Sequence, residues 1–361
     1  MEAVLAELSE RVRAAAEAGT LLRIRGGGTK DFYGERLQGE PLDTRALQGI
    51  VNYEPSELVV TVRAGTPVAQ LEQVLADSGQ SLPFEPPHFG EGATVGGMVA
   101  AGLSGPARAS VGAVRDYVLG LNLVNGRGEH LVFGGQVMKN VAGYDVSRLM
   151  TGAMGTLGVI TQVSLKVLPV PPAEATLRFE MDQATALQRL NAWGGQPLPL
   201  NASCWRPDAG AGQLYLRLRG AVAAVESACR SLGGERLDDG ARAHWHAARD
   251  QRDAWFSGRA GRDLWRLSVP QTAPVLELPE APLVEWHGAQ RWVCAAEADG
   301  AHVRDAALRV GGHATLFRTE RADAPHRMTP LAAPLATLHE RLKQQFDPAG
   351  IFNRGRLYPR F

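Results

Sequence analysis

The sequence predicts an α+β protein built from two domains, and three observations support this fold class. The chain has 361 residues, more than one compact core usually holds. Short strand and helix patterns are mixed along the chain, as in α+β folds. Glycine is abundant: 41 of the 361 residues are glycine, more than a typical usage of roughly 7% would give. Many of these glycines cluster between Gly26 and Gly158. Prolines at positions 169, 171 and 172 then place a domain boundary near residue 170.

The first 170 residues are expected to carry most of the strands. Apolar residues recur at helical spacing over 2–18, which predicts a helix there that ends at Gly19. A second helix is predicted over 67–78, with Thr66 as its cap and Pro67 at its first position. Residues 83–112 are rich in Gly, Ala and Pro and are too irregular for a long helix. The strands expected here are 21–25, 47–51, 58–62, 118–124, 130–133 and 157–167, with a hairpin turn at 125–128.

The part after residue 170 shows a different pattern, typical of a small α+β unit. Strands are predicted at 173–179 and 213–219, and helices at 183–193 and 222–232. Residues 240–265 are expected to be partly helical. The tail, 331–361, contains an amphipathic helix that stops at Phe346-Asp347-Pro348. The sequence contains no internal repeat.

Charge and cysteine content exclude several classes of protein. Lys+Arg and Asp+Glu are equal at 38 each, so no electrostatic feature favours nucleic acid as a partner. Cys204, Cys229 and Cys294 have no metal-binding spacing and are expected to be free thiols in a reducing cytosol, which predicts no metal site. The N-terminus lacks the apolar stretch of a signal peptide. No window is apolar enough for a transmembrane helix, so we expect a cytoplasmic protein.

Three glycine-rich segments fit the chemistry of a diphosphate, because bare backbone lets N–H groups reach its oxygens. They read RGGGTK at 25–30, GATVGGMVAAGLSG at 92–105 and GAMGTLGVI at 152–160. A Walker loop needs GxxxxGK[ST], which the first segment lacks. A Rossmann fingerprint needs GxGxxG at the start of a helix, and no convincing helix follows Gly28. We therefore expect a bulky residue at Gly27 or Gly96 to abolish nucleotide retention by blocking the phosphate.

These segments, together with VMKNVAGYDVSRLMTGAMGTLGVIT at 137–161, resemble the FAD-binding domain of the vanillyl-alcohol oxidase/p-cresol methylhydroxylase family. Within that family they are most similar to the FAD-binding E subunits of bacterial glycolate oxidases. The tail FDPAGIFNRGRLYPRF is similar to the family's closing FDPxxIxNPG motif. The resemblance implies a FAD-binding domain of two α+β subdomains over 1–170. It also implies a reduced cap over 171–330 and a C-terminal segment, 331–361, that returns to the FAD domain.

The resemblance also implies which residues hold the cofactor. Residues 25–30 would lie on the pyrophosphate, the second segment on the next phosphate and ribose, residues 112–116 near the flavin, 158–160 on the adenine side, and Asn353 near the ring. For the apolar members, core packing is the alternative role. The cofactor residues expected are Arg25, Gly26, Gly27, Gly28, Thr29, Lys30, Thr94, Val95, Gly96, Gly97, Ala100, Gly102, Gly112, Arg115, Asp116, Gly158, Val159, Ile160 and Asn353. Lys139, Asn140 and Tyr144 are either structural caps or flavin-site residues.

The positions of the histidines in the sequence indicate how FAD is attached. Some family members bind FAD covalently through a histidine in the first loop, but no histidine lies between residues 20 and 80. His88 lies in the second region, where cysteine is the usual partner. We therefore expect non-covalent FAD.

Catalytic residues are not evident from the sequence. Oxidation of a 2-hydroxy acid by a flavin needs a base for the hydroxyl proton and a cation for the carboxylate. The HxGDGNxH-type metal motif of related catalytic dehydrogenases is absent, and Met154 replaces the glutamate of the family's GSEGTLG. The weak candidates lie in a polar cluster at 318–327, which is alternatively a solvated loop or a subunit contact. They are Arg318, Arg321 and His326, with Glu320 and Arg327 beside them.

Three hypotheses follow from the resemblance. In the first, the chain is a FAD subunit of a glycolate oxidase complex that works with a catalytic FAD subunit and an iron–sulfur subunit and passes electrons to a quinone. Such a complex would hold the chain peripherally at the inner membrane. In the second, the chain is a self-sufficient FAD-dependent D-2-hydroxy-acid dehydrogenase. In the third, its FAD is redox-silent and only stabilises a partner.

Overall fold

The computed structural model describes residues 2–135, 144–208, 210–237, 240–321, 324, 326–359 and 361. Lys139 and Asn140 lie outside these residues. The chain forms two compact units. The first comprises Met1–Leu103, Ala113–Pro169 and Pro330–Phe361, and the second comprises Ser104–Gly112 and Val170–Thr329. The segment 104–112, expected in the first domain, therefore belongs to the second unit.

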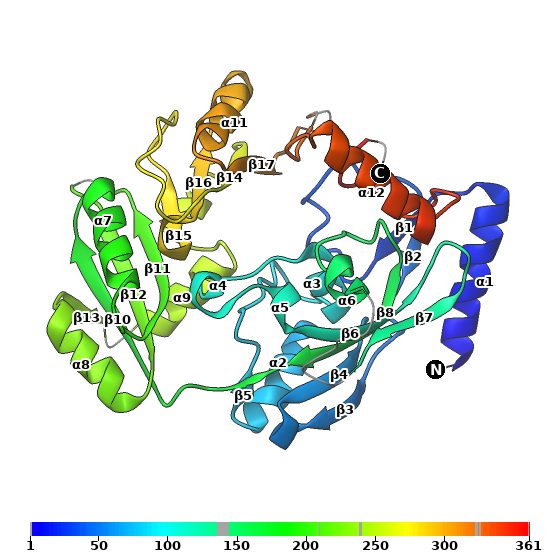
Figure 1. The fold of residues 1–361 in the computed structure, drawn as a ribbon, viewed down its shortest axis with the longest axis horizontal. Helices are drawn as coiled ribbons and strands as arrows, with labels where there is room; N and C mark the ends of the chain where they lie inside the picture. Colours follow the sequence, from blue (N-terminus) through cyan, green and yellow to red (C-terminus); the bar gives the residue numbers. More distant parts are fainter. Residues whose placement is uncertain are drawn as a thin grey trace. The chain divides into compact units, whose positions relative to one another are not determined.

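The larger part of the first unit is a five-stranded antiparallel sheet in the order β3-β4-β8-β6-β7 (Figure 1). Its strands are β3 (Ile50–Glu54), β4 (Val59–Arg63), β6 (Val118–Val124), β7 (His130–Gly134) and β8 (Val159–Lys166). The helices of this part are α2 (Val68–Asp77), α3 (Val95–Ala101), α5 (Val114–Tyr117) and α6 (Val146–Met150). A short ladder joins β5 (Gln80–Ser81) to β9 (Leu168–Pro169).

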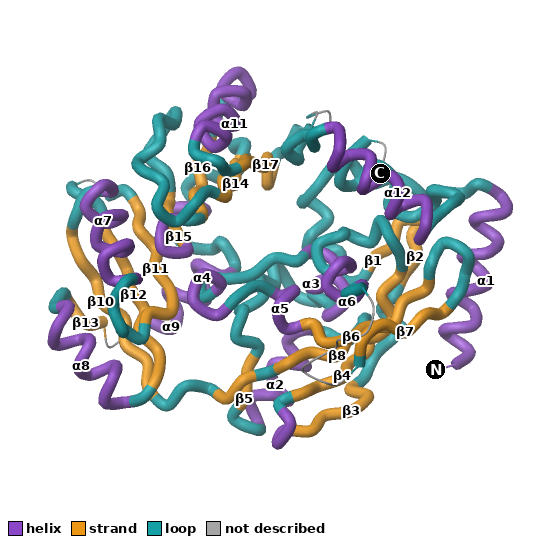
Figure 2. Tube along the Cα trace, in the orientation of Figure 1, coloured by secondary structure: helices purple, strands orange, loops and turns teal. Residues whose placement is uncertain are grey.

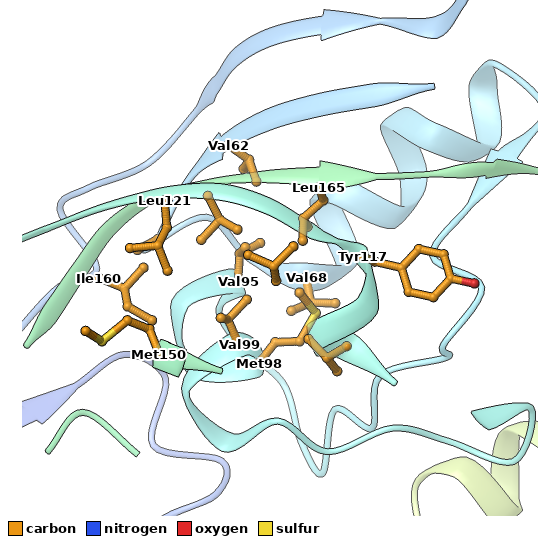
Figure 3. Packing of buried hydrophobic residues seen from close by; sticks show 14 of the residues in the cluster. Val62, Val68, Val95, Met98, Val99, Tyr117, Leu121, Met150, Ile160 and Leu165 are labelled. Carbon is orange, nitrogen blue, oxygen red and sulfur yellow. The ribbon is translucent and has the colours of Figure 1, made fainter. Parts of the chain in front are cut away.

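The core of this sheet is built around α3. Figure 3 shows Val95, Met98 and Val99 of α3 packed among the apolar side chains of the neighbouring strands. All three are at most 1% exposed. Burying an apolar side chain of this size contributes roughly 1.5–3 kcal/mol, so α3 is fixed to the sheet although it has only seven residues.

A smaller subdomain of the first unit is formed by segments from both ends of the chain. It contains α1 (Glu2–Ala18), the parallel pair β1 (Leu22–Arg25) and β2 (Glu40–Asp43), and the segment after α12 (Ala333–Phe346). Leu8, Val12 and Leu22 share one apolar cluster with Ile351 and Phe352. Leu22 also forms a parallel bridge with Phe352. The tail therefore lies beside the strand that leads into the first glycine loop.

The second unit contains an eight-stranded sheet in the order β13-β10-β12-β11-β15-β16-β14-β17. One half has a β-α-β-β-α-β arrangement with strand order typical of ferredoxin-like folds. Its helices share one apolar cluster, so both cover the same face of this half (Figure 2). These elements are β10 (Ala173–Glu180), α7 (Gln183–Gly194), β11 (Leu200–Arg206), β12 (Gln213–Gly220), α8 (Val222–Leu232) and β13 (Glu235–Leu237).

The other half of this sheet packs against α11 (Gly300–Arg309) in a separate apolar cluster. Its strands are β14 (Leu264–Ser268), β15 (Leu283–Glu285), β16 (Gln290–Cys294) and β17 (His313–Arg318). The remaining helices are α4 (Arg108–Val111), α9 (Ala241–Arg249) and α10 (Ala254–Ser257), with 3-10 turns η2 (Trp286–Gly288) and η3 (Glu297–Asp299).

The α+β fold class and most predicted elements agree with the structure, but the predictions for the strand at 47–51 and for the start of the helix at 67–78 were wrong. The strand expected at 47–51 is β3, which begins only at Ile50, because Leu47 is a buried loop residue whose carbonyl accepts from Gly65 N at 2.7 Å. The hairpin then closes through the 3-10 turn η1 (Pro55–Glu57). Thr66 does not cap α2. Pro67 is the N-cap residue, and the Thr66 hydroxyl instead accepts from Gly49 N at 3.0 Å.

Candidate functional site

The first glycine-rich segment forms a loop directly after β1. Residues 26–31 turn the chain, and Asp31 N donates to Gly28 O at 3.1 Å. Within the described ranges, the backbone N–H groups of residues 26–29 donate to no other protein atom. Four successive free donors on bare backbone are the arrangement that binds the oxygens of an anion. The loop is therefore a candidate anion cradle.

A cavity opens beside this loop in the first unit. Its empty volume is about 550 Å³, a figure that includes open solvent at its mouth. The predicted residues that line it are Arg25, Gly26, Gly27, Gly28, Thr29, Lys30, Thr94, Gly97, Ala100 and Asn353. Five further lining residues were not predicted: Ile24, Asp31, Leu37, Ala101 and Arg356. Met154 also lines the cavity, although it was expected only as a departure from the family pattern.

Glycine is required in this loop chiefly by protein packing. A Cβ on Gly27 would lie 1.7 Å from Gly92 O, and one on Gly26 would lie 2.2 Å from Thr94 Oγ1. Gly28 has φ +71°, a conformation that side chains rarely adopt. The close approach that excludes a side chain at Gly27 is thus to the second glycine segment, and not only to a bound phosphate as we expected.

The second segment forms the opposite wall through α3, but its first-turn donors are already used. Val95 N donates to Thr66 O at 2.9 Å, and Gly96 N donates to Ala64 O at 2.7 Å. Gly97 N donates to the side chain of the N-cap residue Thr94 at 3.2 Å. These bonds tie α3 to the end of β4. The N–H groups of Val95, Gly96 and Gly97 are therefore not available to a ligand.

The C-terminal tail forms another part of the cavity wall. Asn353 is held on both sides: Ile24 N donates to its Oδ1 at 2.8 Å, and its Nδ2 donates to Met154 O at 2.6 Å. Arg356 donates to the carbonyl oxygens of Glu35 and, at 2.9 Å, Asp31. The polar atoms of the Asn353 side chain are thus engaged with backbone groups.

Positive charge gathers at the loop. Arg25 Nε lies 3.1 Å from Asp31 Oδ2, and both side chains are more than a third exposed, so this pair contributes little to stability. Lys30 Nζ lies 3.4 Å from Thr29 Oγ1 and 5.7 Å from the ring centroid of Phe89. His88 does not line the cavity, and its Nε2 lies 3.0 Å from Glu72 Oε2.

The other predicted cofactor residues do not line this cavity. Val95, Val159 and Ile160 are buried in apolar clusters. A Cβ on Gly96 would lie 2.8 Å from Ala64 Cβ, and Gly102 ends α3 in the left-handed conformation. Their cofactor roles, and those of the residues that follow, remain predictions. Gly112 ends α4 in the second unit. Arg115 and Asp116 are exposed on α5, and Tyr144 is 96% exposed. Gly158 packs near Leu123.

The sequence gives a signal for some of the unexpected lining residues. Ile24 and Asp31 flank the predicted loop directly, and Ala101 continues the second segment. Met154 has φ +51° and donates its backbone N–H to Ala100 O at 2.8 Å. Arg356 follows the closing motif but lies outside it. No sequence pattern connects it with residues 31 and 35, because more than 320 positions separate them.

The polar cluster at 318–327 lies in the second unit and is largely engaged in internal contacts. Arg321 Nη2 lies 2.7 Å from Asp263 Oδ2, its Nη1 lies 2.6 Å from Glu297 Oε1, and these carboxylates raise its pKa. Arg318 donates to Gln251 Oε1 at 3.2 Å, and burial lowers its pKa. His326 is exposed. Arg327 Nη2 donates to Arg321 O at 3.3 Å, and Glu320 lies near Gly261.

Two buried titratable groups in the second unit were not predicted. Glu285 Oε2 accepts from Trp292 Nε1 at 2.7 Å and from Gln290 Nε2 at 2.9 Å. Burial is the main cause that raises the pKa of Glu285 to about 7. His287 Nδ1 lies 3.0 Å from Ser203 Oγ, its Nε2 lies 2.9 Å from Ser110 Oγ, and burial lowers its pKa to about 4.

Comparison with known proteins agrees with the geometry of the first unit. Residues 4–134 match the family model described as FAD binding domain, which places this unit in a class of FAD-binding proteins. The whole chain is 46% identical over 351 residues to glycolate oxidase subunit GlcE of Escherichia coli (strain K12), covering 97% of this chain and 96% of the relative. The chain belongs to the GlcE-type family of glycolate oxidase subunits.

Two further similarities are partial or structural. Glycolate oxidase subunit GlcD of Bacillus subtilis (strain 168) is 35% identical over 132 residues, which is 36% of this chain and 28% of that protein. A solved structure of an alkyldihydroxyacetonephosphate synthase superposes with a TM-score of 0.65 and 17% identity, covering 96% of this chain and 74% of the other. At that identity the likeness shows a shared fold alone.

The residues around the cavity fit the diphosphate of FAD. The free N–H groups of residues 26–29 supply neutral donors, and the ammonium of Lys30 and the guanidinium of Arg25 supply positive charge beside them. An anion at such a site is stabilised by both contributions. None of the described residues that line the cavity is His, Cys or Tyr.

Proposed function

We propose that this chain is the FAD-binding subunit of a glycolate oxidase complex that oxidises glycolate or a related small 2-hydroxy acid to the 2-oxo acid. The observation that carries the proposal is the 46% identity to a GlcE subunit over 97% of the chain. The free N–H donors of residues 26–29 support it, because they form a cradle for the cofactor's diphosphate.

The chain's own residues account for cofactor binding more completely than for catalysis. When bound, FAD supplies the acceptor for the two electrons and the hydrogen that leave the substrate carbon. A carboxylate clamp needs a cation with free donors, but Arg321 already pairs with Asp263 and Glu297. This supports a chain that acts together with a catalytic FAD subunit.

The onward path of the electrons also points to partners. Iron–sulfur clusters are held by groups of cysteine thiolates, and Cys204, Cys229 and Cys294 are free and dispersed. The described residues contain no group of His, Cys, Asp or Glu side chains placed to bind a metal. No helix among them is long and apolar enough to cross a bilayer. We therefore propose an iron–sulfur partner that passes electrons to a quinone and holds this chain peripherally at the membrane.

An anaerobic reduction experiment tests the proposal. The purified full chain, loaded with FAD, is mixed with glycolate or D-lactate, alone and after reconstitution with its partner subunits. We expect the flavin absorbance to bleach only when the partners are present. Bleaching by the isolated chain would instead identify a self-sufficient dehydrogenase. Flavin on this chain that is never reduced in the complex would identify a structural cofactor, and the proposal of a redox role would be wrong.

A further inference from the structure

We propose that the C-terminal tail preorganises the anion cradle, with Arg356 as the positioning residue that fixes the outgoing side of the glycine loop. The inference rests on the proposed FAD-binding function. It assigns Arg356 a role in shaping the loop, distinct from direct pairing of its charge with the phosphates.

The tail is first anchored by a buried ion pair. Lys343 Nζ donates to Asp347 Oδ2 at 2.7 Å, to Thr156 O at 2.6 Å and to Phe352 O at 2.8 Å. Asp347 in turn accepts from the N–H groups of Ile351 at 3.1 Å and Phe352 at 2.8 Å. Asp347 is 0% exposed. A buried charge with this many partners holds a single geometry, so the residues that follow start from a fixed point.

The tail then reaches the incoming side of the loop through Asn353. Its Oδ1 accepts from Ile24 N at 2.8 Å, two residues before the first free donor. Thr44 N donates to Arg25 O at 3.0 Å. Because a peptide unit is planar, a fixed Arg25 carbonyl also fixes the direction of the Gly26 N–H.

Arg356 fixes the outgoing side. Its guanidinium donates to the carbonyl oxygens of Glu35, of Asp31 at 2.9 Å and of Lys30 at 3.4 Å. Its own carbonyl accepts from Glu35 N at 2.9 Å. Asp31 N donates to Gly28 O, and this bond sets the direction of the Thr29 N–H. The four free donors thus lie between two held ends.

The chemistry of arginine explains why this position needs a guanidinium. A guanidinium carries several donors in a rigid plane, whereas an ammonium is a compact point charge. Arg356 donates to three carbonyl oxygens on the outgoing side of the loop, which requires the several donors of the planar guanidinium. A lysine would retain the positive charge beside the phosphates but would lose the rigid arrangement of several donors. Charge and positioning can therefore be separated by substitution.

The test compares Arg356→Lys and Arg356→Gln with the exposed neighbour variant Arg354→Lys as a matched control. The FAD dissociation constant of each full chain is measured by flavin fluorescence at several salt concentrations. We expect Arg356→Lys to weaken binding by at least about tenfold and Arg356→Gln to follow within a few-fold, with unchanged salt dependence. Arg354→Lys should bind as the unaltered chain does.

Two outcomes would overturn the inference. If Arg356→Lys binds FAD normally while Arg356→Gln binds weakly with a shallower salt dependence, Arg356 is a counter-charge and positions nothing. If neither variant changes affinity, the tail does not control the cradle. In both cases FAD binding by the unaltered chain would still support the proposed function.

A second measurement does not depend on FAD. Amide hydrogen exchange of the ligand-free chain should be faster in Arg356→Lys at the hydrogen-bonded amides of Asp31, Tyr33 and Glu35, by about tenfold or more, and unchanged in β10–β12. Equal exchange at these three amides in the variant and the unaltered chain would contradict the inference. If the unaltered chain shows no FAD binding, this readout still decides whether Arg356 orders the loop.

Discussion

Gly27 lies where two glycine segments cross, and its neighbours determine the effect of a substitution. A Cβ there would lie 1.7 Å from Gly92 O, so Gly27→Ala must move one backbone away from the other. We expect FAD affinity to fall by at least about tenfold, because the free donors of the loop move with it. Gly194→Ala, whose Cβ meets nothing within 4 Å, is the control. Equilibrium titration with FAD checks this, and normal affinity in Gly27→Ala would contradict the packing argument.

Glu285 gives a prediction about pH. Its folded-state pKa of about 7 lies above the ordinary 4.5, mainly because of burial, with Asp253 adding a smaller effect. The folded state therefore binds the proton more tightly, and the stability this contributes is present below pH about 4.5 and is lost as the pH rises through about 7.

The variant Glu285→Gln should remove this dependence, because an amide oxygen can still accept from Trp292 and Gln290. We expect it to be more stable than the unaltered chain at pH about 8, by roughly 1–3 kcal/mol, and the difference should shrink towards acidic pH. Urea unfolding followed by tryptophan fluorescence measures this. A constant difference at every pH would show that Glu285 does not titrate in this range.

At the scale of elements, the helix α3 carries one glycine that packs against the protein and an adjacent glycine that lines the cavity. Gly96 and Gly97 are neighbours on this short helix, but a Cβ on Gly96 would press on Ala64 of the loop after β4. A Cβ on Gly97 would meet only Thr94 Oγ1, at 3.1 Å, and Gly97 lines the cavity. Adjacent substitutions should therefore have different effects.

We expect Gly96→Ala to destabilise the first unit by about 1–3 kcal/mol. Gly97→Ala should leave stability unchanged or raise it by roughly 0.5–1 kcal/mol, while its methyl group lowers FAD affinity. Thermal unfolding of the FAD-free chain and FAD titration together resolve the two effects. Equal loss of stability in both variants would mean that α3 is not held against β4 as described.

The sequence predicts local elements well and long-range contacts poorly. The helix over 2–18 and the hairpin of β6 and β7 follow from periodicity and turn residues, which act within a few positions. Strands β14 to β17 were not predicted. β15 and β16 are short and buried throughout, so no alternating pattern marks them, and β14 and β17 are short strands with few exposed positions. The start of β3 was misplaced because tertiary packing buries Leu47 in a loop.

The candidate site shows the same division. The loop at 25–30 was predicted because glycine reports backbone requirements directly. The hydrogen bonds that join Asn353 and Arg356 to residues 24–35 were not predicted, because their partners are backbone carbonyls and N–H groups, which carry no sequence signal. The donors of α3 were expected to face a phosphate, but hydrogen bonds to Ala64 and Thr66 already use those of Val95 and Gly96.

At the scale of the whole molecule, the two units have separate apolar cores. All seven tryptophans lie between residues 193 and 292, in the second unit. Tryptophan fluorescence therefore reports the unfolding of the second unit, whereas flavin release reports the first.

We expect saturating FAD to raise the unfolding midpoint of the first unit by mass action and to shift the tryptophan transition less. Thermal scans at increasing FAD concentration, recording both signals, measure this. If the two midpoints rise by the same amount, the units unfold as one cooperative body.

The proposed function requires that the first unit holds FAD at the loop after β1. Titration of the purified, FAD-free full chain with FAD, followed by acid precipitation, tests this claim most directly. We predict saturable binding of one FAD per chain, with all flavin released into the acid supernatant. A chain that takes up no FAD, alone or with its partner subunits, would contradict the central claim, and flavin that remains with the precipitate would contradict non-covalent attachment.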